Sequence, residues 1–153
     1  MHTRSSPQEL RTFFVTFVTA GRRSIFQVER NAGLLLDVVR LDREKGRYCV
    51  HGWVVMPDHV HLLLTPAEDV PLEKAVQFVK GGFSFRLKSV HEVWQPGYTE
   101  HRIQDSDDFE RHVEYIVRNP VRAGLGNDYS WSSLKHAELV DPRPEHFGGR
   151  AQG

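Results

Sequence analysis

Two histidines, His59 and His61, form the first pattern in the sequence that can carry chemistry. They begin an apolar run that predicts a β-strand, and successive side chains of a strand point to opposite faces of its sheet. Both imidazoles therefore project from one face, where together they can bind a metal cation. Because His-x-His spacing is weak evidence by itself, surface histidines or hydrogen-bonded histidines are the alternative.

Tyr115 is the second candidate, and it lies on the polar side of a predicted helix. The apolar stripe of this helix, at three- and four-residue spacing, consists of Phe109, Val113, Ile116 and Val117. The polar side carries, together with Tyr115, the residues Arg111, Arg118, Asn119 and Arg122. Asn119 follows Tyr115 by one turn, so its amide oxygen can point the same way as the tyrosine hydroxyl. The structural alternatives are a boundary tyrosine and an asparagine that ends the helix before Pro120.

The elements that must position these residues follow from periodicity and turn signals. β-branched and aromatic runs predict strands, apolar residues at helical spacing predict helices, and Pro57-Asp58 suits a tight hairpin turn. Gly81-Gly82 indicates a weak, bent middle in the second helix. The expected elements are a strand at 12–20, a helix at 28–45, a hairpin of 48–56 and 59–65, a helix from Pro71 toward Val90, a strand at 98–104 and a helix that opens at 105–108.

This order, βαββαβ with an added tyrosine-bearing helix, is typical of the ferredoxin-like α+β sandwich. In that fold an antiparallel sheet carries two helices on one face, which leaves the other face for function. The first and third strands are central in this topology. We therefore expect His59 and His61 in the middle of the sheet.

Length and composition fit one compact domain. The chain has 153 residues, of which 39% are hydrophobic and 26% charged, enough to bury a core. We expect a single domain over residues 1–140 and a loosely held tail over 141–153, where prolines and glycines accumulate. No stretch approaches the roughly 20 apolar residues of a membrane span, and the polar start is unlike a signal sequence. These features favour a cytoplasmic protein that does not bind a membrane.

The distribution of charge is more informative than its sum. The formal net charge is zero, so the whole chain does not attract polyanions. Residues 1–50 carry nine Lys or Arg against five acids, whereas residues 105–114 carry five acids against Arg111 alone. A polyanion would be steered to one side of the molecule.

Several segments resemble one family of DNA-processing enzymes. The string at 55–63 (VMPDHVHLL) resembles the His-hydrophobic-His motif of HUH endonucleases as it occurs in single-tyrosine transposases, and 115–125 (YIVRNPVRAGL) resembles their tyrosine helix. Further similarities lie at 79–84, 94–101 and 131–133. Since they run in order along most of the chain, the set is far more specific than any one motif. The sequence is similar to the REP-associated tyrosine transposases, which act on palindromic repeats.

The resemblance implies a ferredoxin-like fold, Tyr115 as the nucleophile, and a divalent cation, Mg²⁺ or Mn²⁺, bound by His59, His61 and Asn119. The cation would polarise the scissile phosphate while Tyr115 attacks it. The 3′-hydroxyl would leave, and the resulting 5′-phosphotyrosine would retain the energy for rejoining strands without ATP. The expected partner is single-stranded DNA or a hairpin-forming palindromic repeat, and both a monomer and a homodimer are compatible with the sequence.

Basic residues in two regions are candidates for binding DNA phosphates. Arg118 and Arg122 neighbour the expected nucleophile, whereas Lys80, Arg86 and Lys88 belong to the second predicted helix. Solvated arginines on a helix surface are the alternative for the first pair.

Two other functions fit part of the pattern. A non-catalytic DNA-binding regulator with this fold would need neither the histidine pair nor Tyr115. A phosphoesterase that activates water would use two His-x-His-like motifs, and the sequence has one. A covalent adduct between protein and DNA would distinguish the three functions.

Overall fold

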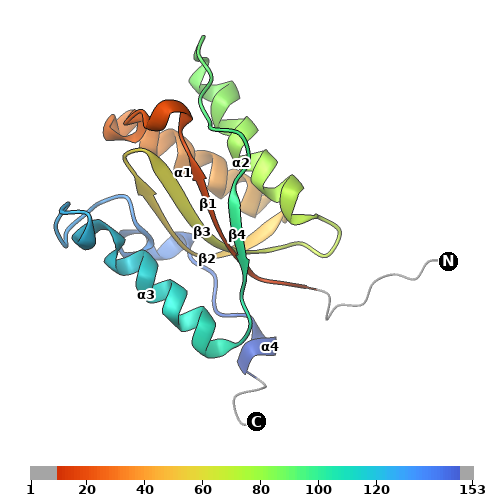
Figure 1. Cartoon of the computed structure of the whole chain (residues 1–153). Helices are drawn as coiled ribbons and strands as arrows, with labels where there is room; N and C mark the ends of the chain where they lie inside the picture. The colour runs from red at the N-terminus through yellow and green to blue at the C-terminus, as the bar shows by residue number, and fades with distance from the viewer. Residues whose placement is uncertain (1–9, 149–153) are drawn as a thin grey trace.

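The computed structural model describes residues 10–148, and its strands and helices follow the expected βαββαβ order (Figure 1). The elements are β1 (Phe13–Val18), α1 (Glu29–Glu44), β2 (Tyr48–Met56), β3 (His59–Pro66), α2 (Leu72–Leu87), β4 (Thr99–Arg102), α3 (Ser106–Arg122) and the short α4 (Glu145–Gly148). The ferredoxin-like α+β class is confirmed. Among the helices of the described residues, none is both long enough and apolar enough to cross a membrane.

The four strands form one antiparallel sheet in the order β2-β3-β1-β4. β1 and β3 are the central strands, as expected. In the register between them, Thr16 lies opposite His61 and Val18 lies opposite His59. On its other side β1 pairs with β4, so that Phe14 lies opposite His101. One strand thus connects the histidine pair with the β4 edge of the sheet.

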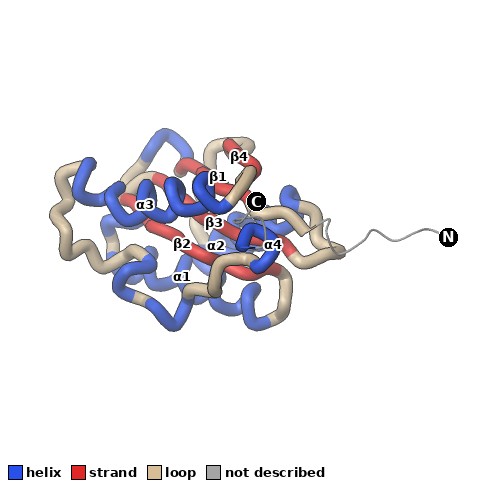
Figure 2. Tube along the Cα trace, turned by 90° about the horizontal axis from the view of Figure 1, so that it is seen from below, coloured by secondary structure: helices blue, strands red, loops and turns tan. Residues whose placement is uncertain are grey.

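Helices cover both faces of the sheet (Figures 1 and 2). Val60, Leu62 and Leu64 of β3 join the larger core beneath α1 and α2, whereas Leu63 joins a smaller core beneath α3. The alternation expected along β3 is therefore confirmed. The second face is not fully open, however, because Phe109 and Ile116 of α3 pack on it. The histidines consequently lie beneath a helix at the edge of a small core.

The glycine pair in α2 has a packing role. The helix runs without a break from Leu72 to Leu87, through both glycines. A Cβ placed on Gly82 would lie 2.9 Å from Cγ1 of Val38 on α1. On Gly81 the nearest atom would be the terminal nitrogen of the flexible Gln77 side chain, at 3.3 Å. Gly82 therefore lets the two helices approach each other.

The C-terminal segment is packed more extensively than the expected loose tail. The Asp141 carboxylate accepts hydrogen bonds from the Arg43 guanidinium at 2.8 Å and from the Val50 backbone N–H at 2.8 Å. Phe147 is buried and lies against Phe109, with ring centroids 5.9 Å apart. The segment thus contributes to the core beneath α3, while residues 149–153 lie outside the described residues.

The two glycines make a matched test of this helix contact. We expect Gly82→Ala to lower the free energy of unfolding, because overpacking against buried Val38, about 1–3 kcal/mol, exceeds the gain of roughly 0.5–1 kcal/mol from replacing a helical glycine. Gly81→Ala should instead stabilise the protein by up to about 1 kcal/mol. Urea denaturation followed by circular dichroism measures both changes, and equal stabilisation by the two alanines would contradict the packing role of Gly82.

Candidate active site

The β2–β3 hairpin places His59 and His61 on the face beneath α3. The turn at Pro57 and Asp58 connects the strands directly, and the register puts Val54 of β2 opposite His61 and Met56 opposite His59. The two rings lie with centroids 4.8 Å apart and planes at 79°. The His-x-His spacing therefore brings the two imidazoles into contact on one face of the sheet.

His61 presents one ring nitrogen that has no protein partner. Its Nδ1 is 2.7 Å from the Thr16 hydroxyl, whereas its Nε2 is buried and has no hydrogen bond within residues 10–148. Burial, with a further contribution from His59, lowers the pKa of His61 to about 3, so the ring is neutral near neutral pH. When Nδ1–H donates to Thr16, Nε2 keeps a lone pair. Metal-binding histidines commonly show this pattern, in which a second protein group holds the non-coordinating nitrogen.

His59 is held in a similar way by its preceding residue. Its Nδ1 lies 2.7 Å from Oδ1 of Asp58. Because a carboxylate only accepts, Nδ1 carries a proton, and in the neutral imidazole Nε2 then has a lone pair. Asp58 is itself held by Arg22, whose Nε is 3.2 Å from Oδ2. Both histidines therefore have Nδ1 engaged and Nε2 available for a cation.

Tyr115 lies directly beside this pair. Its ring meets the His61 ring edge-on at a centroid distance of 5.5 Å, and it meets Phe14 at 5.8 Å. The tyrosine is 38% exposed, and within the described chain its hydroxyl makes no hydrogen bond. The guanidinium carbon of Arg122 lies 5.7 Å from the ring centroid. α3 thus brings a solvent-accessible phenol to the metal-binding candidates.

Asn119 lies inside α3, one turn beyond Tyr115. The helix continues through Pro120 to Arg122 and is capped at Ala123, so the alternative that Asn119 ends the helix is wrong. The side chain is partly buried and, among residues 10–148, makes no hydrogen bond. Its amide oxygen is therefore available to a ligand.

The structure separates the basic candidates into two groups. Arg118 and Arg122 lie on α3, where Arg118 pairs with Glu114 at 2.9 Å. The other three, Lys80, Arg86 and Lys88, belong to α2 or its C-cap, on the opposite face of the sheet.

Lys80 is engaged within the fold. Its ammonium donates to the backbone carbonyls of Gly97 at 2.8 Å and Gln95 at 3.3 Å, and burial lowers its pKa. Lys88 adopts a left-handed conformation, with φ of 56°, at the end of α2. The structure does not bring these lysines to Tyr115.

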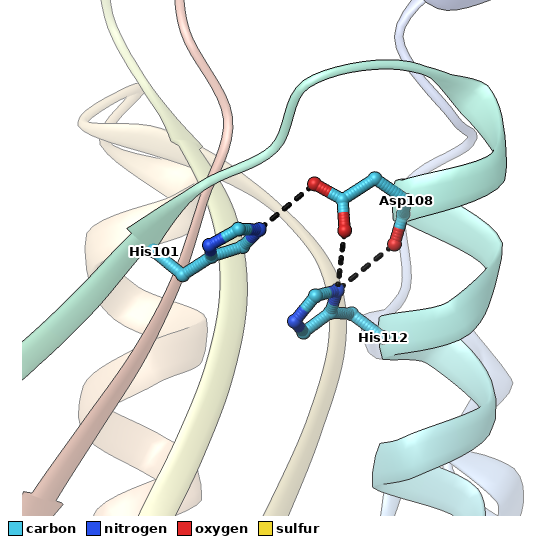
Figure 3. Close-up of side chains that lie close together, drawn as sticks. All are labelled: His101, Asp108 and His112. Carbon is cyan, nitrogen blue, oxygen red and sulfur yellow. Dashed lines mark hydrogen bonds and ion pairs between the residues drawn. The ribbon is translucent and has the colours of Figure 1, made fainter.

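A cluster of His101, Asp108 and His112 was not identified from the sequence (Figure 3). His112 precedes Tyr115 by three residues, and its ring lies 4.8 Å from Phe14. Phe14 in turn stacks against His61 at 5.2 Å. The three-residue spacing of His112 and Tyr115, which places them on one side of a helix, can be seen in the sequence. His101 comes close to His112 only because strand β4 pairs with β1, and the sequence does not show this pairing.

Comparison with known proteins identifies relatives over most of the chain. A family model described as "Transposase IS200 like" matches residues 9–119. The chain is 30% identical over 114 residues to the REP-associated tyrosine transposase of Escherichia coli K12, an alignment that covers 74% of this chain and 68% of that relative. It is also similar to the solved structure of a REP-associated tyrosine transposase bound to a REP hairpin. That match has a TM-score of 0.75 at 26% identity, over 93% of this chain and 88% of the other.

The hydroxyl of Thr16 offers a test of how His61 is oriented. We expect Thr16→Val to weaken Mn²⁺ binding roughly 10- to 100-fold, because the ring loses the partner of Nδ1. Thr12→Val is the matched control, since its hydroxyl pairs with Thr65 at 2.6 Å, away from both histidines. Isothermal titration calorimetry measures both affinities. Unchanged Mn²⁺ affinity in Thr16→Val would show that Thr16 does not position a metal ligand.

Proposed function

The chain belongs to the IS200-like transposases, in the branch of the REP-associated tyrosine transposases, and we propose that it is a metal-dependent single-strand DNA endonuclease and transesterase with Tyr115 as its nucleophile. The main support is the edge-on contact between Tyr115 and His61, whose buried Nε2 has no partner within residues 10–148. A nucleophile and an available metal ligand in contact are what phosphoryl transfer by this chemistry requires.

The donor set fits a divalent cation. His59 and His61 each have Nδ1 engaged, so their Nε2 atoms are available, and Asn119 adds a neutral amide oxygen. These ligands leave the charge of the cation undiminished, and they suit Mn²⁺, or Mg²⁺ when waters complete the shell. When bound, the cation supplies Lewis-acid polarisation of the scissile phosphate.

The chain's own residues supply the nucleophile and its surroundings. The Tyr115 oxygen attacks phosphorus and loses its proton, the bond from phosphorus to the 3′ oxygen breaks, and that oxygen leaves as a hydroxyl after taking up a proton. A 5′-phosphotyrosine remains, and attack by another 3′-hydroxyl reverses the step and joins strands. Arg122, beside the Tyr115 ring, is positioned to bind a non-bridging phosphate oxygen.

The proposed substrate is single-stranded DNA that forms a hairpin. A structural relative of 26% identity was solved with a REP hairpin, and the similarity to it covers 93% of this chain. A tyrosine fixed on a helix also needs a flexible, exposed backbone for in-line attack. We therefore infer that hairpin-forming palindromic DNA is preferred over paired duplex.

The nucleophile is tested by removing one oxygen atom. We expect Tyr115→Phe to bind DNA and metal but to form no covalent adduct, since its ring contacts with His61 and Phe14 are retained. With 3′-end-labelled hairpin DNA and Mn²⁺, denaturing electrophoresis should show a labelled protein for wild type only. Tyr98→Phe is the control, because Tyr98 packs against the core on the other face.

The same gel separates the competing functions. A wild-type protein that binds the hairpin without cleaving it would be a DNA-binding regulator. Cleavage that releases a free 5′-phosphate and survives in Tyr115→Phe would indicate activated water and would remove Tyr115 from the mechanism.

The two groups of basic residues predict different responses to mutation. Arg122→Gln should weaken hairpin binding at every sequence and reduce the slope of log affinity against log salt by about one, as expected for a lost phosphate contact. Arg86→Gln, on the opposite face, should leave the slope unchanged. Fluorescence anisotropy across a salt series measures both, and a larger loss from Arg86→Gln would place the DNA along α2 instead.

A further inference from the structure

His101, Asp108 and His112 form a cluster that the proposed transesterification does not use (Figure 3). His101 comes from β4, and the other two come from the first turns of α3. The Nε2 atom of His101 lies 2.8 Å from Oδ2 of Asp108, and Nδ1 of His112 lies 3.2 Å from Oδ1 of the same carboxylate. One donor atom from each residue can be chosen so that all three lie within 4.8 Å of one another.

We propose that His101, Asp108 and His112 bind a second divalent metal ion, of the Zn²⁺ class, which links strand β4 to the start of α3. Two imidazoles and one carboxylate are a recurrent zinc-binding set, with water in the remaining position. Imidazole ligands favour Zn²⁺ over Mg²⁺, and the third ligand distinguishes the two sites, because it is the Asp108 carboxylate here and the neutral Asn119 amide in the proposed tyrosine site.

The carboxylate at the centre of the cluster is suited to a cation. The Asp108 side chain is only 6% exposed. Burial alone would raise the pKa of Asp108, but the Gln104 backbone N–H and the His101 imidazole hold it below its usual value. The carboxylate is therefore ionised near neutral pH, and a metal would take the place of the protons that it now shares with the two histidines.

The surroundings also favour a cation. Asp105 and Asp107 lie in the same turn as Asp108, and Arg111, 3.5 Å from the Asp108 carboxylate, is the nearest opposing charge. The His101 side chain is 45% exposed, so an ion can reach the cluster from solvent. Without metal, Nδ1–H of His112 donates to the Asp108 carbonyl at 2.9 Å. Coordination through this nitrogen would require the ring to carry its proton on Nε2 and would break this hydrogen bond.

The cluster is separated from the tyrosine site by one ring. The His101 and His112 rings stack with centroids 4.8 Å apart, and the His112 ring also contacts Phe14. Phe14 in turn contacts both His61 and Tyr115. A metal that fixes His112 would therefore limit movement of the helix turn that carries the nucleophile. This role would be structural, and metal binding at the cluster is independent of whether Tyr115 cleaves DNA.

Zinc titration of four proteins tests the second site. We expect wild type to bind two equivalents of Zn²⁺ by calorimetry, one at the His59–His61 pair and one at the cluster. His101→Ala should bind one equivalent, and so should His59→Ala/His61→Gln. His91→Ala, which removes an exposed histidine remote from the cluster, should still bind two.

The four proteins test the two proposed metal sites independently. Two equivalents of zinc in His59→Ala/His61→Gln, with one in His101→Ala, would count against the metal site beside Tyr115 and leave the cluster intact. If circular dichroism shows that wild type and His101→Ala are both folded, an equal zinc stoichiometry in the two proteins would overturn the proposed zinc site. His101→Gln repeats the test with a side chain that keeps a polar contact to Asp108, and it should lose the same equivalent.

Discussion

The packing of Ile116 on strand β2 is the interaction on which the candidate site depends. Ile116 is buried, and a Cβ on Gly52 of β2 would lie only 3.3 Å from its Cδ1. The absence of a side chain at Gly52 therefore lets α3 lie close to the sheet. Tyr115 precedes Ile116 in the same helix turn, so this contact determines how far the phenol stands from His61. The apolar stripe of α3 packs the helix on the sheet, and its polar side, one residue away, carries Tyr115.

This arrangement has a thermodynamic cost at His61. Covering the sheet with α3 takes the His61 ring out of water, which lowers its pKa and leaves Nε2 without a partner among the described residues. A buried polar atom that lacks a hydrogen bond costs roughly 1–3 kcal/mol. A bound cation would offset that cost, so metal binding and the packing of α3 should stabilise each other. The Thr16 hydroxyl satisfies only the other ring nitrogen.

Local patterns in the sequence predicted the elements and the positions of the candidate site residues on them. Alternation along β3 correctly placed His59, His61 and Leu63 on one face, and helical spacing correctly placed Tyr115 outside the apolar stripe of α3. Both inferences depend on periods within a single element. The β2–β3 hairpin was also predictable, because its strands are joined by a two-residue turn.

Features that depend on contacts between distant segments were not predictable in this way. The register of β1 against β3 and β4 brings Phe14 and Thr16 to the histidines and His101 to α3, and no local period encodes it. That the sheet separates the basic residues of α2 from those of α3 likewise follows only from how the helices pack on it. Gly82 was interpreted as a weak point in a helix, whereas its role is visible only once Val38 lies against it.

The central position of β1 couples the two histidine sites. Phe14 projects from it between His61 and His112, and Thr16, two residues later on the same face, holds His61. On α3, His112 and Tyr115 are three residues apart and so share one side of the helix. A shift of α3 along the sheet would therefore change the contacts of His112 with Phe14 and those of Tyr115 with His61 together. Because β1 pairs with a strand on each side, the sheet is the more rigid of the two elements. A relative movement would therefore be a movement of α3. The position of Tyr115, the proposed nucleophile, thus depends on the contacts that hold the first turns of α3, where Asp105 caps the helix and Asp108 hydrogen-bonds to His101.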